Sequence, residues 1–341
     1  MLETIWFLLW SILWALYFML DGFDLGLGTL MPFLGKNDTE RRIIYNAMGP
    51  FWDGNEVWLI TAGGVTFAAF PGTYAVLFSA FYSPLMLILF ALIIRAAAFE
   101  FRAKLPGRAW RSLWDVCMAL GSFVPALILG VAFANIFRGI PIDGEGVYQG
   151  NILTLLNSYG LLGGLLFLFL FLVHGALWLA VKSEGILQQR AIRYAKSLWI
   201  LLVVVAVLFL AHTWFETGLY HNYTLIPALL LVPLIAVLAL LLVRVYLATK
   251  ACGKAWLASS LTIILVTLFG VIGLYPNMLI SSVHPAYNLT VFNGASSPGT
   301  LTIMLVVAVI FVPLIILYQG WVYWLFRGKV RAEDLHTDEA Y

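Results

Sequence analysis

Nine long apolar segments constrain the fold of this chain more than any other feature of its sequence. Each has about 20 or more mostly apolar residues, the length that an α-helix needs to cross the hydrocarbon core of a bilayer. Only 11% of all residues are charged, against roughly 25% in a soluble domain, so a soluble enzyme is excluded. The sequence predicts an all-α, polytopic membrane protein with nine transmembrane helices at residues 5–30, 52–70, 74–99, 113–137, 157–181, 197–215, 224–248, 256–279 and 301–326.

The first apolar segment, 5–30, is predicted to remain in the protein as a transmembrane helix. No Lys or Arg precedes it, its apolar run is longer than that of a secretory signal peptide, and it lacks a convincing small-residue cleavage site. The longest loops have about 20 residues, which is too few for a folded unit outside the membrane. We therefore expect residues 1–341 to form a single integral membrane domain that ends in a tail at 327–341.

Basic residues are distributed very unevenly between the two sides of these predicted helices. With nine helices, every Lys and Arg except Arg138 falls on the side that carries the C-terminal tail. Loops rich in Lys and Arg face the cytoplasm in membrane proteins. The sequence therefore predicts an N-terminus outside the cell and a C-terminus in the cytoplasm.

Six acidic residues lie in the cytoplasmic half of the predicted helices or at its edge: Asp21, Asp24, Asp53, Glu56, Glu100 and Asp115. Ionisable groups inside a span are costly, and they usually pair with one another or line a protein-enclosed path. Two interpretations remain open. The acids take up protons from the cytoplasm, or they form structural ion pairs, with Arg95 at a depth that Asp24 or Asp115 could reach.

The acids of the 52–70 segment also have a purely structural interpretation. Asp53 followed three residues later by Glu56 resembles a capping box, in which the two side chains bind the free N–H groups of a helix start. Asp21 and Asp24 lie well inside the first helix and three residues apart, so they share one helical face. For both pairs, the sequence alone leaves a structural role and a proton-carrying role open.

The His and Cys residues do not form the pattern of a cofactor site. His174 lies about 25 Å from the outer end of its predicted helix at 1.5 Å per residue, whereas His212 lies about one turn from the outer end of the next. Two haem ligands must share one depth, so we expect no haem on this chain alone and a hydrogen-bonded core role for His174. Cys117 and Cys252 face the reducing side without a CxxC motif, which excludes a disulfide and covalent haem, and no metal site is expected.

Three Trp residues follow one face of the first predicted helix. Trp6, Trp10 and Trp14 are spaced four residues apart, so they form a stripe along the helix. We interpret this stripe as a packing or lipid-facing surface rather than an electron relay.

Several long strings of unusual composition carry a family resemblance. They are DGFDLG at 21–26, GKNDTERR at 35–42, GPFWDGNEVWLITAGG at 49–64, RAAAFEFR at 95–102 and WDVCMALGSFVPALILGVAFAN at 114–135. Together they resemble subunit II of the cytochrome bd-type quinol oxidases. The resemblance covers nearly the whole chain and is strongest in its first 140 residues.

The resemblance implies a respiratory complex of the bacterial inner membrane that oxidises quinol and reduces oxygen to water. In the family, subunit I holds two b-type haems and one d-type haem, and subunit II packs against it as a pseudo-symmetric partner. The implied architecture is a four-helix bundle within 1–137, a second within 157–279 and an additional helix at 301–326. Lipids and quinone are implied partners, and the sequence leaves open whether a small single-helix subunit joins the complex.

The resemblance also assigns roles to individual residues. Asp53 matches a carboxylate proposed to lie on the proton path towards the haems, with Glu56 beside it and Trp58 as a packing residue. Four charged positions match or adjoin those linked to the stability of the haem-containing half: Asp21, Asp24, Arg95 and Asp115. The outer loops are short here, which leaves a lipid or quinone site on this subunit in doubt, and the quinol-oxidising loop belongs to subunit I.

Two other functions fit nine helices with intramembrane acids. An ion-coupled secondary transporter would need a site near the midplane made of broken helices with unwound backbone. The midplane prolines, Pro84 and Pro125, have no acid within a helical turn, which counts against this function. A passive scaffold that only stabilises a haem subunit would need every buried charge to be structural.

Overall fold

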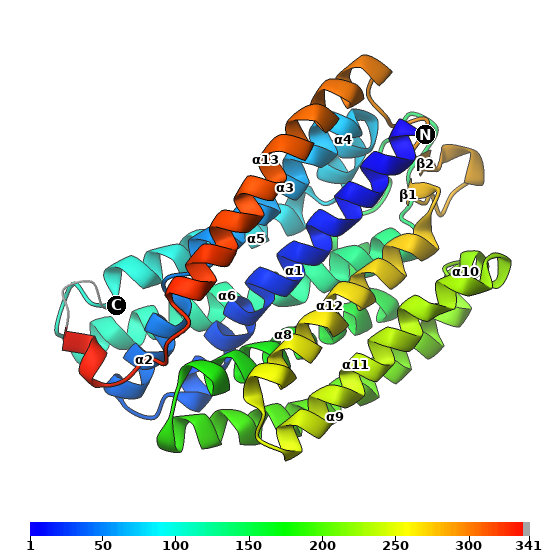
Figure 1. The fold of residues 1–341 in the computed structure, drawn as a ribbon. Helices are drawn as coiled ribbons and strands as arrows, with labels where there is room; N and C mark the ends of the chain where they lie inside the picture. The colour runs from blue at the N-terminus through cyan, green and yellow to red at the C-terminus, as the bar shows by residue number, and fades with distance from the viewer. Residues whose placement is uncertain (337–341) are drawn as a thin grey trace.

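The computed structural model describes residues 1–336, so the last part of the predicted tail, 337–341, lies outside the described residues. The long helices run side by side along one direction, and the N-terminus and the C-terminal segment lie at opposite ends of the molecule (Figure 1). The helices are α1 (Leu2–Leu34), α2 (Asp38–Met48), α3 (Trp52–Ala69), α4 (Pro71–Ala80), α5 (Tyr82–Phe101), α6 (Arg108–Arg138), α7 (Ile152–Leu155), α8 (Ser158–Lys182), α9 (Gly185–Glu216), α10 (His221–Leu225), α11 (Leu231–Ala248), α12 (Cys252–Leu274) and α13 (Pro298–Leu325).

The predicted class, an all-α polytopic membrane protein, is confirmed. Within residues 1–336, eight helices are long and apolar enough to cross a membrane. The predicted span 52–70 is the helix α3, but it is not one of these eight, because its first turns carry Asp53, Asn55 and Glu56. A polar helix of this kind needs other protein around it at membrane depth. The count of nine spans and their orientation remain predictions.

Proline residues end or divide three of the predicted spans, which corrects their boundaries. The segment 74–99 is not one helix: α4 ends at Ala80 and α5 begins at Tyr82, because Pro84 has no N–H for a continuous helix. Pro227 lies in a short 3₁₀ turn (Pro227–Leu230), so α11 begins only at Leu231. Pro276 follows the end of α12, and the next residues form β1 (Asn277–Leu279), which pairs antiparallel with β2 (Leu289–Thr290).

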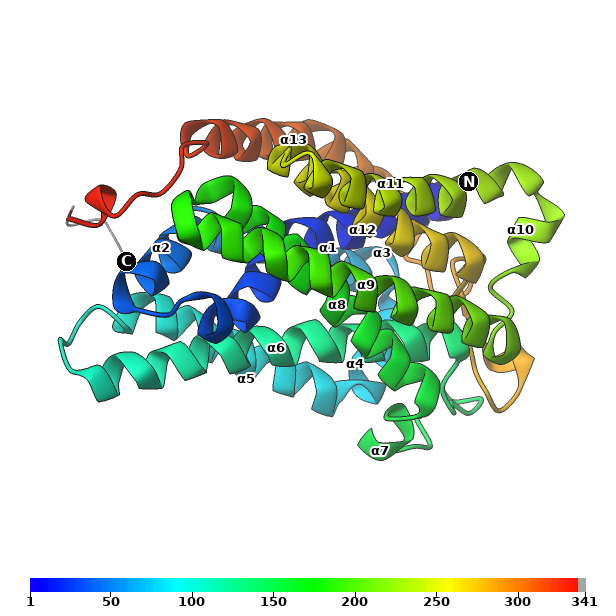
Figure 2. The ribbon, with the colours of Figure 1, turned by 90° about the horizontal axis from the view of Figure 1, so that it is seen from below.

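The helices α1 and α8 form the centre of the molecule. Seen from below, α11 and α13 lie along one edge and α5 and α6 along the other, with α1 and α12 between them (Figure 2). Helix α1 contacts α3, α6, α8 and α12. The Trp stripe faces into this packing rather than towards lipid: Trp6 and Trp10 are buried and donate hydrogen bonds to the Leu301 carbonyl and the Thr66 hydroxyl at 2.9 and 2.8 Å.

Two glycines let α1 and α8 approach closely. A Cβ atom on Gly26 would lie 1.7 Å from the carbonyl oxygen of Phe171, and one on Gly175 would lie 2.3 Å from the backbone nitrogen of Leu27. Small residues at such crossings allow backbone contact between membrane helices. This crossing places the inner part of α1, with its two acids, against the rest of the bundle.

We expect Gly26→Ala to disrupt this crossing. The added methyl group meets rigid backbone and not a movable side chain, so the cost should be at or above the roughly 1–3 kcal/mol that is typical of overpacking. The measurement is the thermal unfolding midpoint and the yield of the purified protein. Gly253→Ala is the matched control, because no atom lies within 4 Å of its added Cβ; equal behaviour of the two variants would contradict the prediction.

Candidate functional site

A buried ion-pair cluster joins three helices. Arg95 on α5 contacts Asp21 on α1 at 2.7 Å and Glu56 on α3 at 3.2 Å. The Arg95 and Asp21 side chains are almost fully buried, at 1% and 0% exposure, whereas Glu56 is 19% exposed. We call this cluster, Asp21–Arg95–Glu56, the buried triad.

The expected partners of Arg95 were wrong. Neither Asp24 nor Asp115 forms an ion pair with Arg95 among the described residues. Arg95 packs beside Gly121 of α6, where an added Cβ would lie 2.9 Å from the Arg95 Cβ atom. Asp115 is six residues earlier on the same helix, about 9 Å away along its axis. The depth of Arg95 therefore matches Asp21 instead.

Asp24 belongs to a second, hydrogen-bonded network that starts from Asn55. The Asn55 side-chain amide donates to the Asp24 carboxylate at 2.7 Å, and its carbonyl oxygen accepts from Gln319 at 2.9 Å and from the Tyr323 hydroxyl at 3.1 Å. Gln319 in turn accepts a hydrogen bond from the indole of Trp58 at 2.6 Å. The network ties α13 to α1 and α3.

Asn55, Gln319 and Tyr323 were not among the residues predicted from the sequence. A side-chain amide or hydroxyl inside an apolar span needs a buried partner, which is the signal that these residues carry in the sequence. Nothing in the sequence says which partner each of them has. Trp58 is buried, as expected of a packing residue. Its indole also has a polar partner on α13, which the packing role did not include.

The capping interpretation of Asp53 and Glu56 is wrong. Helix α3 begins at Trp52 with Phe51 as its N-cap residue, and no side chain caps it. Asp53 therefore lies inside the first turn and is exposed, while Glu56 points to Arg95 and not back to the helix start. The turn from Met48 to Phe51, closed by a 2.8 Å backbone hydrogen bond, starts the helix earlier than the capping pattern requires.

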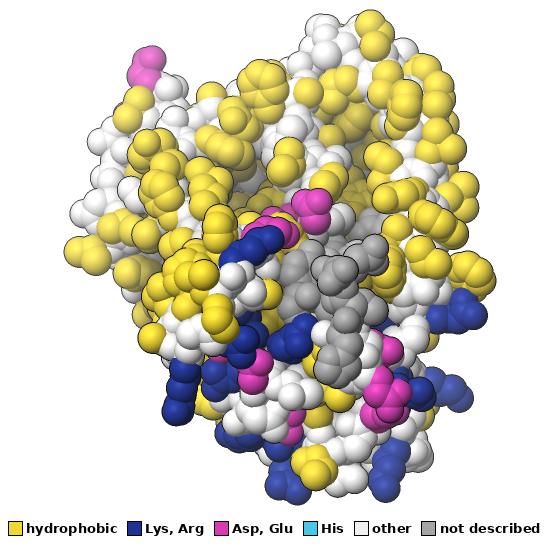
Figure 3. Space-filling model, turned by 90° about the vertical axis from the view of Figure 1, so that its left-hand side faces the viewer, with side chains coloured by type: hydrophobic (Ala, Val, Ile, Leu, Met, Phe, Trp, Pro, Cys, Tyr) yellow, Lys and Arg dark blue, Asp and Glu magenta, His cyan; other side chains and the backbone are white. Residues whose placement is uncertain are grey.

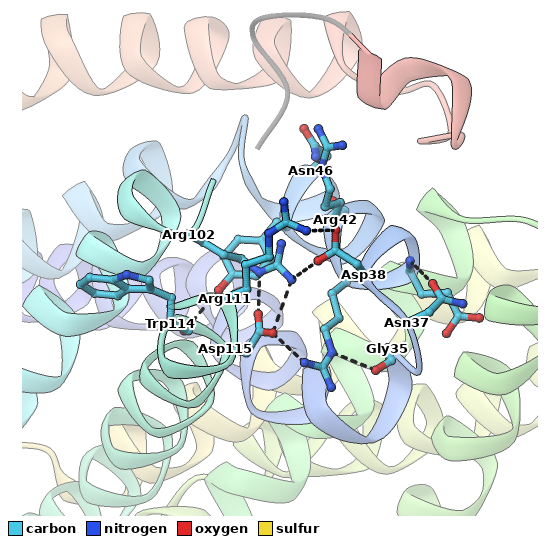
Figure 4. Close-up of polar contacts among 12 residues, drawn as sticks. Gly35, Asn37, Asp38, Arg42, Asn46, Arg102, Arg111, Trp114 and Asp115 are labelled. Carbon is cyan, nitrogen blue, oxygen red and sulfur yellow. Dashed lines mark hydrogen bonds and ion pairs between the residues drawn. The ribbon is translucent and has the colours of Figure 1, made fainter. Parts of the chain in front are cut away.

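Asp115 is the centre of a separate ion-pair network at the end of the bundle where α2 lies (Figure 4). It accepts from Arg102 at 2.6 Å and from Arg41 at 2.7 Å. Asp38 joins the network through Arg102 at 2.8 Å and Arg111 at 3.0 Å. Burial would lower the pKa of the Arg102 guanidinium, but these carboxylates outweigh that effect and raise it above its ordinary value.

His174 is buried and is the expected hydrogen-bonded core residue. Its two ring nitrogens contact the Ser259 hydroxyl and the Met19 carbonyl oxygen, both at 3.1 Å. His212 lies on α9 beside Glu216, at 3.6 Å. Within residues 1–336, no three His, Cys, Asp or Glu side chains are grouped so as to hold a metal ion.

The fold and these buried charges define a class: a polytopic helical membrane protein that carries ionisable groups inside its bundle and on the exposed side of α3. Within this class, the family model for the cytochrome bd terminal oxidase subunit II matches residues 2–326. The chain belongs to this family. It is a subunit of a quinol oxidase complex, and a secondary transporter is not favoured.

Relatives and a solved structure agree with this assignment. The chain is 37% identical to the probable cytochrome oxidase subunit 2 of Haemophilus influenzae, over 99% of this chain and 97% of the relative. It is 36% identical to the cytochrome bd ubiquinol oxidase subunit 2 of Bacillus subtilis, over 98% and 99%. The bd oxidase structure from Geobacillus thermodenitrificans contains a chain with the same fold, with a TM-score of 0.79, 19% identity and coverage of 95% and 98%.

Proposed function

We propose that this subunit both stabilises a haem-bearing subunit I and supplies the first part of a proton path from the cytoplasm. The observation that carries this proposal is a graded series of carboxylates on one side of the bundle. Asp53 is exposed, Glu56 is half-buried and Asp21 is fully buried. A proton path needs ionisable groups at successive depths in protein-enclosed surroundings.

The chemistry of each group follows from its place in the series. Asp53 and Glu56 are three residues apart, so they lie on the same side of α3. A proton accepted by Asp53 could move to Glu56 through one or more water molecules. Arg95 holds Asp21 and Glu56 in place at 2.7 and 3.2 Å, which makes it a positioning residue rather than a carrier.

The exposed side of α3 supports a partner subunit at this place. Asp53 and Gly54 are exposed there, and no atom lies within 4 Å of a Cβ built on Gly54 or Gly64. A charged side chain is costly against lipid, and glycines allow close approach of another helix. We infer that subunit I covers this side and continues the path.

The same proposal covers the haems of the partner, the membrane, the orientation of the chain and its helix bundles. The partner would hold two b-type haems and one d-type haem, with none on this chain, and the complex would lie in the bacterial inner membrane and take electrons from quinol. The proposed orientation has the N-terminus outside and the cluster of Lys and Arg in the cytoplasm. The two proposed bundles are 1–137 and 157–279, with an additional helix at 301–326 and the tail 327–341 in the cytoplasm.

A passive scaffold is the second candidate function. The buried triad favours it, because Asp21 already has a cationic partner, Arg95, at 2.7 Å, as expected of a charge whose role is purely structural. The two functions assign different roles to Asp53, which has no ion pair among the described residues. Asp53 carries protons in the first and has no catalytic part in the second.

Co-purification tests whether the chain binds a haem-bearing partner and which of the two subunits holds the haems. The affinity-tagged chain, expressed with the other subunits, should bring a haem protein with it, and a reduced-minus-oxidised spectrum should show b- and d-type bands. The same chain expressed alone should show none, because both ring nitrogens of the buried His174 already have hydrogen-bond partners. A stoichiometric haem on the isolated chain, or no haem in the complex, would contradict the proposal.

A further inference from the structure

A basic pocket lies at the α2 end of the bundle, outside the proposed proton path. It has a volume of about 380 Å³ and is lined by residues of the loop between α1 and α2, of α2, of the loop after α5 and of the first turns of α6. Its charged lining residues are Lys36, Asp38, Arg41, Arg102, Arg108, Arg111 and Asp115. Five cations and two carboxylates leave a formal excess of three positive charges.

The two carboxylates are already used by three of the cations. Asp115 binds Arg41 and Arg102, and Asp38 binds Arg102 and Arg111. Lys36 and Arg108 form no ion pair with any described residue, and both are exposed at the rim. Arg41 and Arg111 are also partly open to solvent, with side-chain exposures of 30% and 35%. The pocket therefore presents unneutralised positive charge on a rigid frame of ion pairs.

The surroundings of the pocket are those of a membrane surface. Figure 3 looks onto this end of the molecule and shows Lys and Arg gathered in its lower part, while hydrophobic side chains cover much of its upper part. Directly after the pocket residue Ser112, one face of α6 exposes Leu113, Val116 and Leu120, at 54%, 51% and 57%. A ligand with an anionic head in the pocket could lay apolar chains along this face.

We propose that this pocket binds the phosphate head group of an anionic phospholipid from the adjoining leaflet. Arg and Lys are the usual donors to phosphate oxygens, and basic pockets between membrane helices recognise anionic lipid head groups. The excess charge selects an anionic lipid over a zwitterionic one. The exposed α6 face selects a lipid over a soluble phosphate, which has no apolar chains to place there.

The test measures lipid binding directly on the purified complex in an uncharged detergent. Native mass spectrometry follows the binding of dioleoylphosphatidylglycerol and of dioleoylphosphatidylcholine to the wild type and to the double variant Lys36→Gln/Arg108→Gln. Each Lys or Arg near an anionic lipid contributes roughly fivefold to binding. The variant should therefore bind phosphatidylglycerol about 25-fold more weakly, with little change for phosphatidylcholine.

A matched control separates a site from a general charge effect. Arg193→Gln/Lys254→Gln removes the same two charge types from exposed positions on the same side of the helices, away from the pocket. It should bind phosphatidylglycerol as the wild type does. Both variants should keep the wild-type thermal midpoint without added lipid, since the four residues form no ion pairs among the described residues.

Three results would overturn the proposal. They are wild-type affinity in the Lys36→Gln/Arg108→Gln variant, an equal loss in the control variant, and no preference of the wild type for phosphatidylglycerol. A further arm adds glycerol phosphate at millimolar concentration as a head group without chains. Displacement of the lipid by it at that concentration would assign the pocket to a soluble phosphate compound instead.

Discussion

An Asp53→Asn complex should assemble normally and consume oxygen at least tenfold more slowly than the wild type. Asp53 is exposed in the first turn of α3 and caps no backbone group. Asn therefore loses only a favourable interaction with the helix dipole. An amide cannot take up and release a proton in each turnover, and a tenfold slower step corresponds to about 1.4 kcal/mol on the barrier. The measurements are steady-state oxygen consumption, haem content and thermal midpoint.

Glu100→Gln is the control for Asp53→Asn. Glu100 is an exposed acid near the same end of the bundle, on α5, and it forms no ion pair with any described residue. Its loss should leave turnover within about twofold of the wild type, because only the proposed path residues limit proton uptake. Near-normal oxygen consumption by a correctly assembled Asp53→Asn complex would reject the proton role and favour the passive scaffold.

Arg95→Ala should have the largest effect on assembly. The substitution leaves the fully buried Asp21 and the half-buried Glu56 without their shared cation. Breaking a buried ion pair by removing one partner costs about 3–5 kcal/mol. This is a large fraction of the stability of a typical domain. We expect little haem-containing complex in the membrane fraction and a lower thermal midpoint for the part that assembles.

Two further variants test whether the loss of the buried cation is the cause of the assembly defect. Arg193→Ala removes an exposed Arg without an ion pair and should assemble as the wild type does. The double variant Asp21→Asn/Arg95→Gln replaces both fully buried charges by amides and should recover part of the yield. Normal haem content in Arg95→Ala would show that the buried triad does not stabilise the complex. No recovery in the double variant would show that charge pairing is not the cause of the loss.

The positions of the long helices could be predicted from the sequence, but several of their ends could not. The transfer of apolar residues into a bilayer is a property of each segment by itself, so apolar runs identify spans. The helix ends near Phe81, Pro227 and Pro276 depend on where a proline interrupts the backbone hydrogen bonds of a helix. The polar helix α3 was predicted from its length, although its composition does not place it among the membrane-crossing helices of the described chain.

The sequence by itself determined the class of this protein and its family, because long apolar segments and long shared strings are properties of the chain. Only the tertiary structure decided which of the charged residues are buried and how they pair. Arg95 meets Asp21 and not Asp24 or Asp115, and Asp24 meets Asn55. A pairing of this kind depends on the depth and rotation of helices that are far apart in the sequence. The crossings at Gly26 and Gly121 set both quantities through backbone contact, which no pattern within a single helix reports.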